Sequence, residues 1–331
     1  MPRHPTLESV AARAGVSRAT AGRVLSGMSV KDANREAVQQ AAAELGYVTN
    51  YAARALMTGR SGSVAFVMSA DEMFSDPFFA TILRGVHQGV AARQRQLMFI
   101  IASVADERRR LEQYVAGGHL DGVMIGALHG PDPLPDEIRR LGVPVVQCGR
   151  PHQPDPEQPF VDADNEGGAA QAARYLLERR TSVVMVAGPS DMTPAQDRLS
   201  GFARELERAG VPLAGRVAHE SFTIEGGRAA MNILLDRVPD LDGVFAASDA
   251  MALGAIQALT ERGRRVPDDV GVVGFDDVPL AAAARPPLTT VRQPVIEMGR
   301  TLAEQLLDLV DGTGEARRVL LPTELVVRDS A

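Results

Sequence analysis

The chain has 331 residues but a single cysteine, Cys148, which excludes an internal disulfide framework and any zinc or iron–sulfur site built from several cysteines. We expect Cys148 to be a buried thiol at the end of a strand, in VPVVQCG. No run of about 18 apolar residues is present to cross a bilayer. The first residues, MPRHPTLESV, lack the apolar stretch of a secretory signal. These absences predict a cytoplasmic protein.

Motifs for common cofactors and catalytic sites are missing too. The sequence contains neither a GxGxxG segment nor a Walker loop, and its six histidines are scattered without the spacing of metal ligands. We therefore expect no cofactor, no metal site and no enzyme activity. A catalytic serine at Ser190 or Ser248 stays an open alternative, because the sequence does not show whether a histidine lies beside either.

Negative charge dominates the chain as a whole, with a net charge of −7, which alone argues against binding to nucleic acid. The charge is unevenly distributed. Residues 1–60 carry eight basic and four acidic residues, a net charge of +4, whereas the rest carries 27 basic and 38 acidic residues, a net charge of −11. A small basic head on an acidic body predicts a protein that contacts DNA only through its head, because phosphates attract the head and repel the body.

The head contains the spacing of a helix-turn-helix. In TLESVAARAGVSRATAGRVLSG, small and apolar residues line the inward faces of two short helices. Gly15 stands at the turn, where glycine adopts a positive φ without a Cβ penalty, and Ser17 is a suitable N-cap for a second helix that starts at Arg18. A third helix is predicted in DANREAVQQAAAELGY, with Gly46 as its stop. Three such helices make a small core.

An ordinary helical bundle with solvated arginines would show the same pattern. The residues on the outward face of the second helix help to distinguish the two possibilities. This face carries Arg18, Ala19, Gly22 and Arg23 near the start of the helix. A recognition helix meets base edges in the major groove at this end, and arginines there predict contacts to guanine.

The head resembles that of the lac-repressor (LacI/GalR) family in VAARAGVSRATAGRVL, in ELGYVTNYAARAL and in the spacing between these segments. The resemblance implies that the second helix reads DNA through Ser17, Arg18, Ala19, Thr20 and Arg23. It also implies a hinge, Asn50 to Thr58, that becomes helical only on DNA. Leu56 matches the leucine that wedges into the minor groove and bends the duplex, and Ala53 matches the small residue through which paired hinge helices pack. Without the resemblance, Leu56 could equally be a linker residue docked on the body.

Two positions depart from the family pattern. Gly22 replaces a serine that usually reaches a phosphate, which removes one backbone contact and costs about 1 kcal/mol inside a helix. Lys31 replaces the serine that usually caps the third helix, which leaves Asp32 as the nearby candidate cap.

From Ser63 onward, short apolar runs alternate with amphipathic helical stretches, and the pattern repeats after residue 160. The expected strands are VAFVM, LMFIIA, DGVMIG and VPVVQCG in the first half, and SVVMVAG, DGVFAAS and VGVVGF in the second. Such alternation predicts parallel sheets covered by helices on both faces. The fold class is thus an α-helical helix-turn-helix head joined to a two-lobed α/β sensor. The expected limits are 1–48 for the head, 49–62 for the hinge and linker, 63–160 plus about 291–320 for the first lobe, and 161–290 plus about 321–331 for the second.

This body resembles the periplasmic sugar-binding proteins and the sensor half of the lac-repressor family over nearly the whole chain. Open α/β sheets bind ligands beyond the carboxyl ends of their strands, which places a small effector in the cleft between the lobes. The residues that the resemblance implies for effector binding are Asp76, Phe78 and Phe79 of SDPFF, Arg198 of DRLSGF, Phe222, Ser248 beside Asp249, and Asp276 of VGFDD.

A carbohydrate is the favoured effector, because a guanidinium forks onto neighbouring hydroxyls, an aromatic face stacks on a sugar ring and a carboxylate accepts hydroxyl hydrogen bonds. Purines and other metabolites remain alternatives, since Ser248 stands where asparagine is common. Asp276 could also cap a loop, Phe222 could belong to the core, and Arg198 could pair with Asp197 or Glu205 on its own helix. The SDPFF phenylalanines could serve both core and cleft.

We expect a transcription regulator, a repressor, whose affinity for a pseudopalindromic operator changes when the effector binds. Two heads on half-sites about one helical turn apart require a homodimer, and no leucine heptad follows Val327 to build a tetramer. The strongest rival is a solute-binding protein that delivers sugar to a transporter, against which the basic head and the missing signal argue. The sequence leaves open whether the effector releases DNA or strengthens its binding.

Overall fold

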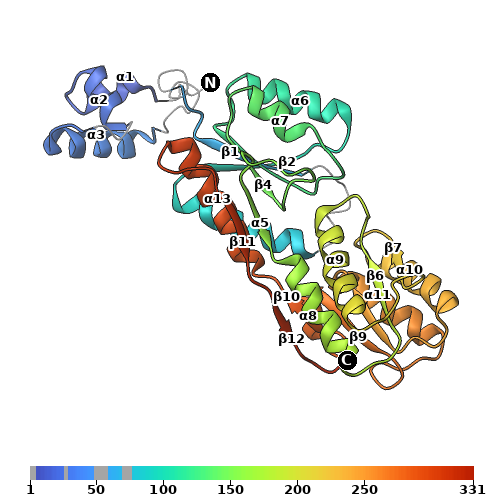
Figure 1. The fold of residues 1–331 in the computed structure, drawn as a ribbon. Helices are drawn as coiled ribbons and strands as arrows, with labels where there is room; N and C mark the ends of the chain where they lie inside the picture. The colour runs from blue at the N-terminus through green and yellow to red at the C-terminus, as the bar shows by residue number, and fades with distance from the viewer. Residues whose placement is uncertain (1–4, 26–28, 48–58, 69–76) are drawn as a thin grey trace. The chain divides into compact units, whose positions relative to one another are not determined.

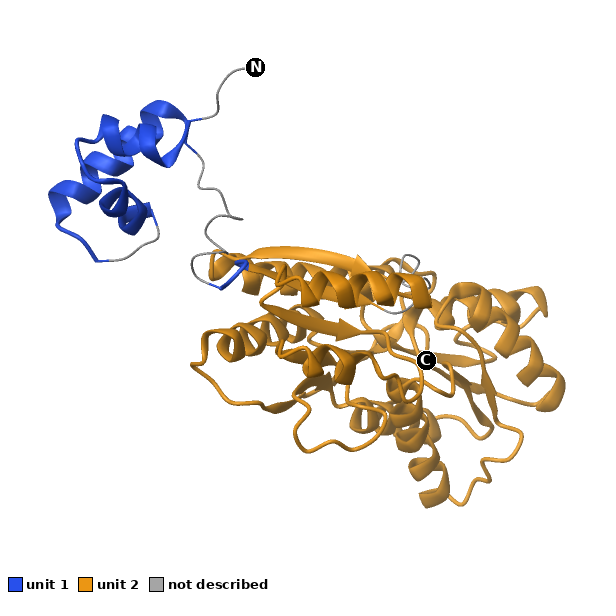
Figure 2. Ribbon diagram, turned by 90° about the horizontal axis from the view of Figure 1, so that it is seen from above, with its two compact units in different colours: residues 1–62 blue, residues 63–331 orange. Residues whose placement is uncertain are grey.

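The structure is a computed structural model that describes residues 5–25, 29–47, 59–68 and 77–331. The chain divides into two compact units, Met1–Gly62 and Ser63–Ala331, which Figure 2 shows in different colours. Each unit has hydrophobic core residues of its own. Among the described residues, none of the helices combines the length and the apolar character needed to cross a lipid bilayer.

The described part of the head contains the three predicted helices. They are α1 (Leu7–Arg13), α2 (Arg18–Leu25) and α3 (Asp32–Leu45). Their shared core includes Val10, Val24 and Val38, together with Ala11 and Ala21, whose small side chains let the helices approach closely. As predicted, Gly15 takes a positive φ of 67° in the turn and Gly46 ends α3 in the left-handed conformation.

The two helix starts of the head differ in how they are capped. Ser17 caps α2 as predicted, because its hydroxyl accepts the backbone N–H of Thr20 at 3.1 Å. The prediction for α3 was wrong. Lys31 is its N-cap without a side-chain hydrogen bond, and Asp32 lies inside the first turn, where its carboxylate pairs with Arg35 at 3.5 Å and faces the positive end of the helix dipole.

The first lobe of the body is built on a sheet of order β11-β5-β4-β3-β1-β2. Its strands are β1 (Ser63–Met68), β2 (Gln96–Ile101), β3 (Gly122–Gly126), β4 (Val145–Cys148), β5 (Phe160–Ala163) and β11 (Arg318–Leu321). Helices cover both faces: α5 (Pro77–Ala92) and α13 (Val295–Asp311) on one, α6 (Ala105–Ala116) and α7 (Leu134–Arg140) on the other. Successive side chains of β1 enter the two cores in alternation, as they do in any strand covered on both faces.

The second lobe is built on a sheet of order β12-β10-β9-β8-β6-β7. Its strands are β6 (Val183–Ala187), β7 (Val217–His219), β8 (Gly243–Ala246), β9 (Gly271–Asp276), β10 (Thr289–Arg292) and β12 (Glu324–Val326). The helices are α8 (Asn165–Leu177), α9 (Thr193–Arg208), α10 (Ile224–Arg237), α11 (Asp249–Glu261) and α12 (Pro279–Ala283). Helix α8 packs beside α9, and α10 packs beside α11 (Figure 1). All seven strands named in the sequence analysis are present, and the two-lobed α/β prediction is confirmed.

Within residues 77–331 the chain passes between the two sheets after β5, after β10 and after β11. Each crossing leaves from the carboxyl end of a parallel strand. Strand β12 therefore enters the second sheet from that end and runs antiparallel to β10, an exception to the predicted parallel order. The carboxyl ends of both sheets consequently meet at the junction of the lobes, where open α/β sheets bind ligands.

Close packing of α5 against α13 holds their amino ends beside this junction. A Cβ atom on Gly85 would lie 2.2 Å from the carbonyl oxygen of Ile296, and one on Gly299 would lie 2.3 Å from that of Ile82. Only glycine allows the two helix backbones to approach so closely. This contact places Phe78 near the start of α5 at the wall of the junction.

Candidate DNA-reading surface and interlobe cavity

Helix α2 presents the side chains predicted to read DNA on its outer surface. Ser17, Arg18, Ala19 and Arg23 are exposed, and Thr20 is half-buried. The hydroxyls of Ser17 and Thr20 lie 2.9 Å apart, which ties the start of the helix together. Arg18 lies 3.0 Å from Glu8, but both side chains are exposed, so this ion pair adds little stability and leaves the guanidinium able to move to DNA.

Four of the predicted site residues lie outside the described residues. They are the hinge residues Asn50, Ala53 and Leu56, and Asp76 of SDPFF. Their roles stay predictions.

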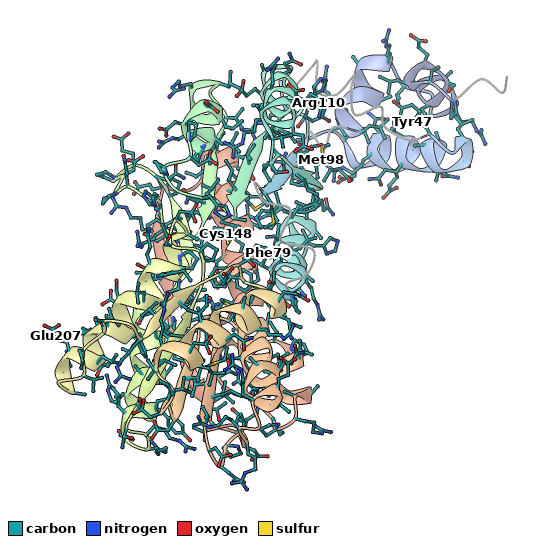
Figure 3. All side chains as sticks on the ribbon, turned by 90° about the vertical axis from the view of Figure 1, so that its right-hand side faces the viewer. Tyr47, Phe79, Met98, Arg110, Cys148 and Glu207 are labelled. Carbon is teal, nitrogen blue, oxygen red and sulfur yellow. The ribbon has the colours of Figure 1, made fainter. Side chains whose placement is uncertain are left out.

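A cavity of about 100 Å³ lies between the lobes, at the carboxyl ends of the two sheets. We call it the interlobe cavity. Five of the predicted effector residues line it together, from both lobes: Phe78, Phe79, Arg198, Phe222 and Asp276. Figure 3 labels Phe79 and Cys148, which lie on its first-lobe side. The rings of Phe78 and Phe79 meet edge to face, with centroids 5.3 Å apart, and form an apolar wall.

Arg198 is the central polar group of this cavity although only 5% of its surface is exposed. Its Nε donates to Oδ1 of Asn165 at 2.9 Å, one terminal nitrogen donates to the carbonyl oxygen of Ala247, and the other lies 3.4 Å from Oδ1 of Asp276. The guanidinium carbon also lies 3.8 Å from the ring centroid of Phe275. These contacts fix the planar group in one orientation, as a fork for neighbouring hydroxyls requires.

The alternative pairing of Arg198 with acidic residues of its own helix does not occur. Asp197 instead receives two hydrogen bonds from Arg150, and Glu205 pairs with Arg174 and Arg208.

Asp276 ends β9 as a buried carboxylate in the left-handed region, with φ of 112°. Nε2 of Gln293 donates to its Oδ1 at 2.5 Å. Close behind it, burial and the negative charge of Asp276 raise the pKa of Asp249 well above its usual value. The carboxyl group of Asp276 lies beside the Arg198 guanidinium, and together the two groups offer an acceptor and a donor to a hydroxyl.

Asp162 is a second buried carboxylate at the cavity, at the end of β5 in the first lobe. Burial raises its pKa to about 6, although the backbone N–H groups of Arg150 and Ala163 donate to it at 2.9 and 2.8 Å. The side-chain amide of Asn165 also donates to Asp162 at 2.9 Å, and the other end of that amide accepts from Arg198. A chain of hydrogen bonds therefore connects the two lobes beneath the cavity.

Comparisons with known proteins agree with both halves of this description. Residues 6–50 match the bacterial regulatory proteins of the lacI family, and residues 173–331 match the periplasmic binding protein-like domain. The HTH-type transcriptional regulator CelR of Thermobifida fusca is 47% identical, over 99% of this chain and 98% of the relative. The chain belongs to the LacI family. The transcriptional repressor CytR of Escherichia coli K12 is 32% identical to it, over 98% of this chain and 96% of CytR.

Solved structures of LacI-family members have the same fold along the whole chain. A complex of CelR with cellobiose has a TM-score of 0.80 at 44% identity and covers 99% of this chain and 100% of that one. The lac repressor dimer bound to operator and the anti-inducer ONPF has a TM-score of 0.85 at 25% identity, with 99% of both chains covered.

Ser248 takes a different place from the one expected of an effector residue in this LacI-family chain. It is buried and does not line the interlobe cavity. Its hydroxyl caps α11 by accepting the backbone N–H of Met251 at 3.2 Å. A serine at the start of a helix performs this role readily because its short side chain reaches back to the N–H two or three residues on.

Phe222 combines the two interpretations that the sequence left open. Its side chain packs partly against the core of the second lobe and also lines the interlobe cavity. A Cβ atom on Gly188 would lie 2.3 Å from the ring of Phe222, so only glycine at this position leaves room for the ring. The guanidinium carbon of Arg198 lies 5.8 Å from the ring centroid.

Several polar residues of the cavity were missed by the sequence analysis. They are Gln147, Asp162, Asn165, Thr193 and Gln293. Asp162 lies in a four-residue strand, β5, whose existence the pattern did not reveal, and Gln293 directly follows β10, another strand that was not predicted. Polar residues after each expected strand end were the available signal, but the number of strands was underestimated.

Cys148 occupies the strand end predicted for it and also lines the cavity. Burial, with a smaller effect of the nearby Asp162 carboxylate, raises the pKa of its thiol to about 12. The thiol is therefore protonated at neutral pH and contributes a small apolar surface.

Proposed function

We propose that this chain is a sequence-specific DNA-binding repressor that binds a pseudopalindromic operator as a homodimer and changes its DNA affinity when a carbohydrate occupies the interlobe cavity. The observation that carries the effector assignment is the placement of Arg198, Asp276 and Phe222 around one cavity. A fixed guanidinium, a buried carboxylate and an aromatic face suit a neutral ligand rich in hydroxyls. The complex of the related CelR with cellobiose supports the same class of ligand.

DNA readout is assigned to the head, 1–48, and the hinge, 49–62. Arg18 and Arg23 are the proposed base-reading residues, because they are exposed on α2 near its start. Ser17, Ala19 and Thr20 accompany them, and Asn50, Ala53 and Leu56 are assigned to the hinge by the family resemblance. The relative solved on operator DNA, the lac repressor dimer, supports this assignment.

The proposed dimer surface lies on the first lobe along β2 and α5. Strand β2 is at the edge of its sheet, and Phe99 on it is 39% exposed. Leu83, Leu97 and Phe99 line a shallow hollow between the strand and the helix. An apolar edge of this kind needs a cover, and a second copy of the chain provides one while placing two heads on one operator.

Coupling between ligand and DNA follows from linkage. A ligand that favours one arrangement of the lobes changes the affinity for DNA, and DNA changes the affinity for the ligand by the same factor. The coupling free energy is typically about 1–3 kcal/mol. Effector contacts on both lobes are the means by which a bound sugar favours one arrangement.

The test is selection of bound sequences from random duplex DNA by the full chain, repeated with cellobiose, D-glucose and adenosine. We expect a palindrome whose recovery one of the sugars changes, while adenosine has no effect. Recovery of no sequence preference under any condition would overturn the DNA-binding assignment and favour a solute-binding protein.

Two variants test whether Arg18 contributes to the sequence preference. Arg18→Ala is expected to relax the preference at one position of each half-site, because one good arginine–guanine contact contributes about 1–3 kcal/mol of discrimination. Arg140→Ala, an exposed arginine of α7, is the matched control and should leave the motif unchanged. An unchanged motif with Arg18→Ala would remove Arg18 from the readout.

A further inference from the structure

The start of helix α1 lies against helix α2 in the head (Figure 1). A Cβ atom on Gly22, in the middle of α2, would lie 3.7 Å from Cδ2 of Leu7 at the start of α1. Arg18 comes four residues before Gly22 and therefore lies on the same face of α2. Glu8 directly follows Leu7. This packing brings the side chains of Glu8 and Arg18 together.

An ion pair joins these two side chains across the helices. Nη1 of Arg18 lies 3.0 Å from Oε1 of Glu8. The side chains of Arg18 and Glu8 are 69% and 66% exposed, so the pair adds little to the stability of the head in water. Its position at the start of the helix assigned to DNA readout therefore calls for another role.

Side-chain caps fix the backbone on both sides of this ion pair. In α1, Oγ1 of Thr6 accepts the backbone N–H of Ser9 at 3.2 Å, and the hydroxyl of Ser9 accepts the backbone N–H of Thr6 at 2.8 Å. Glu8 lies inside this capped turn. In α2, the cap formed by Ser17 directly precedes Arg18. Both charged side chains thus leave the backbone from fixed positions.

The ion pair uses only part of the hydrogen-bonding capacity of Arg18. A guanidinium carries five N–H donors. With Nη1 beside Glu8, the edge formed by Nε and Nη2 can still donate two parallel hydrogen bonds, which O6 and N7 of guanine accept. A side chain that is already restricted loses less freedom when it binds. Glu8 therefore prepares Arg18 for contact with a base.

The charge of Glu8 also acts on the choice between a base and the DNA backbone. An arginine can form a bidentate contact with a phosphate as well as with guanine. A carboxylate beside Arg18 repels phosphates but not the uncharged edge of a base. Arg23, the other arginine assigned to base readout, forms no ion pair within residues 5–25 and 29–47. The effect of Glu8 is therefore specific to Arg18.

We propose that Glu8 is a positioning and specificity-determining residue, which directs the Arg18 guanidinium to a guanine and away from phosphates. This inference rests on the proposed DNA readout by α2 and deepens it. Glu8 acts through Arg18 and does not itself contact a base.

The test is selection of bound sequences from random duplex DNA by the full chain and its variants. Arg18→Ala and Arg23→Ala first identify the half-site position that each arginine reads. Glu8→Ala is then expected to lower the preference for guanine about fivefold at the Arg18 position, a part of what the arginine–guanine contact provides. The Arg23 position should stay unchanged. The double variant Glu8→Ala/Arg18→Ala should lose no more preference than Arg18→Ala alone.

Glu44→Ala is the matched control. It removes a carboxylate of the head whose ion-pair partner, Arg13 at 2.5 Å, lies outside α2. Either variant raises the net charge of residues 1–60 from +4 to +5, so both should strengthen binding to non-specific DNA to a similar extent. Only Glu8→Ala should change the selected motif. Amide hydrogen exchange in α1 and α2 should be alike in the two variants, because neither ion pair is buried.

The outcomes separate this inference from the proposed function. An unchanged motif with Glu8→Ala, while Arg18→Ala changes it, would overturn the role of Glu8 and leave DNA readout by α2 in place. A loss at another position would also overturn it, because Glu8 would then read a base itself by accepting from N4 of cytosine. An equal loss at every position with faster exchange would indicate a structural role instead. Recovery of no motif by the unaltered chain would overturn the DNA-binding assignment as well.

Discussion

Asp162 shows how burial sets the properties of a single residue in this protein. Its carboxylate accepts hydrogen bonds from two backbone N–H groups and from Asn165, yet burial raises its pKa to about 6. The folded protein therefore keeps the proton of Asp162 at pH values where the unfolded chain, with its ordinary pKa near 3.8, has lost it. The contribution of this group to stability is fully present below about pH 4 and is lost as pH rises through about 6.

We predict that Asp162→Asn flattens part of the pH dependence of stability. A pKa raised from 3.8 to about 6 corresponds to about 3 kcal/mol. The free energy of unfolding of the natural chain should therefore fall relative to Asp162→Asn by up to this amount between pH 4 and pH 7.5. Urea unfolding followed by circular dichroism measures the difference.

The control for this prediction is Asp269→Asn. Hydrogen bonding to Arg265 lowers the pKa of Asp269 to about 2, so its contribution is present above about pH 4 and is lost only as pH falls toward 2. The difference between the natural chain and Asp269→Asn should stay constant from pH 4.5 to 7.5. A constant difference for Asp162→Asn over the same range would show that Asp162 does not hold its proton.

Helix α2, to which DNA readout is assigned, contains a glycine that lowers the stability of the helix. Gly22 lies in the middle of this eight-residue helix, where glycine is about 1 kcal/mol less favourable than alanine. A Cβ atom at this position would meet only Cδ2 of Leu7, at an ordinary contact distance of 3.7 Å. The glycine is therefore not required by packing within the described part of the head.

We predict that Gly22→Ala stabilises the head by about 1 kcal/mol. Amide hydrogen exchange of residues 5–47 in the full chain should slow accordingly. The matched variant is Gly15→Ala, in the turn before α2, where φ is 67° and a side chain costs about 1–2 kcal/mol. It should speed exchange over the same residues. Faster exchange in Gly22→Ala would mean that the glycine serves a contact that alanine disrupts.

The two lobes of the body are bridged by side chains on either side of the interlobe cavity. Arg150, in the loop after β4, donates two hydrogen bonds to Asp197 on α9, and one of them measures 2.6 Å. Nδ1 of His129 in the first lobe lies 3.0 Å from Asp191, ahead of α9 in the second. Breaking such a bridge is expected to change the balance between arrangements of the lobes, and through it the affinity for DNA.

We predict that Asp197→Asn changes both operator affinity and effector affinity of the full chain by about five-fold or more, the usual size of an allosteric coupling. Fluorescence anisotropy with labelled operator and titration with cellobiose measure the two. Asp236→Asn is the control, because its ion pair with Arg262 at 3.1 Å is exposed and lies within the second lobe. Unchanged binding of both ligands by Asp197→Asn would exclude this bridge from the coupling.

Local pattern was sufficient to predict the helices of the head and the seven longer or more apolar strands. Helix periodicity, the N-cap at Ser17 and the glycines at turns act within a few residues, so they can be read along the chain. The strands β5, β7, β10, β11 and β12 were missed because each has only three or four residues. So short a segment shows too little alternation or apolar content to be recognised.

The interlobe cavity was predicted in part. Arg198, Phe222, Phe78, Phe79 and Asp276 line it as expected, because motifs near strand ends and in neighbouring helices point to the junction of the lobes. Ser248 does not, since its hydroxyl is used within its own helix start. Whether a polar residue at a strand end faces a cavity or caps a helix depends on backbone direction, which the residue types do not encode.

The amino-acid order alone determined the basic head, the helix-turn-helix and the two α/β lobes, because propensity, periodicity and charge are local or additive properties. The pairing of Arg198 with Asp276 and Asn165 and the raised pKa of Asp162 arose only when distant segments packed together. Three crossings between the sheets within residues 77–331 bring those segments to one junction. Burial there strengthens each electrostatic contact, so the function depends on contacts that no single stretch of sequence contains.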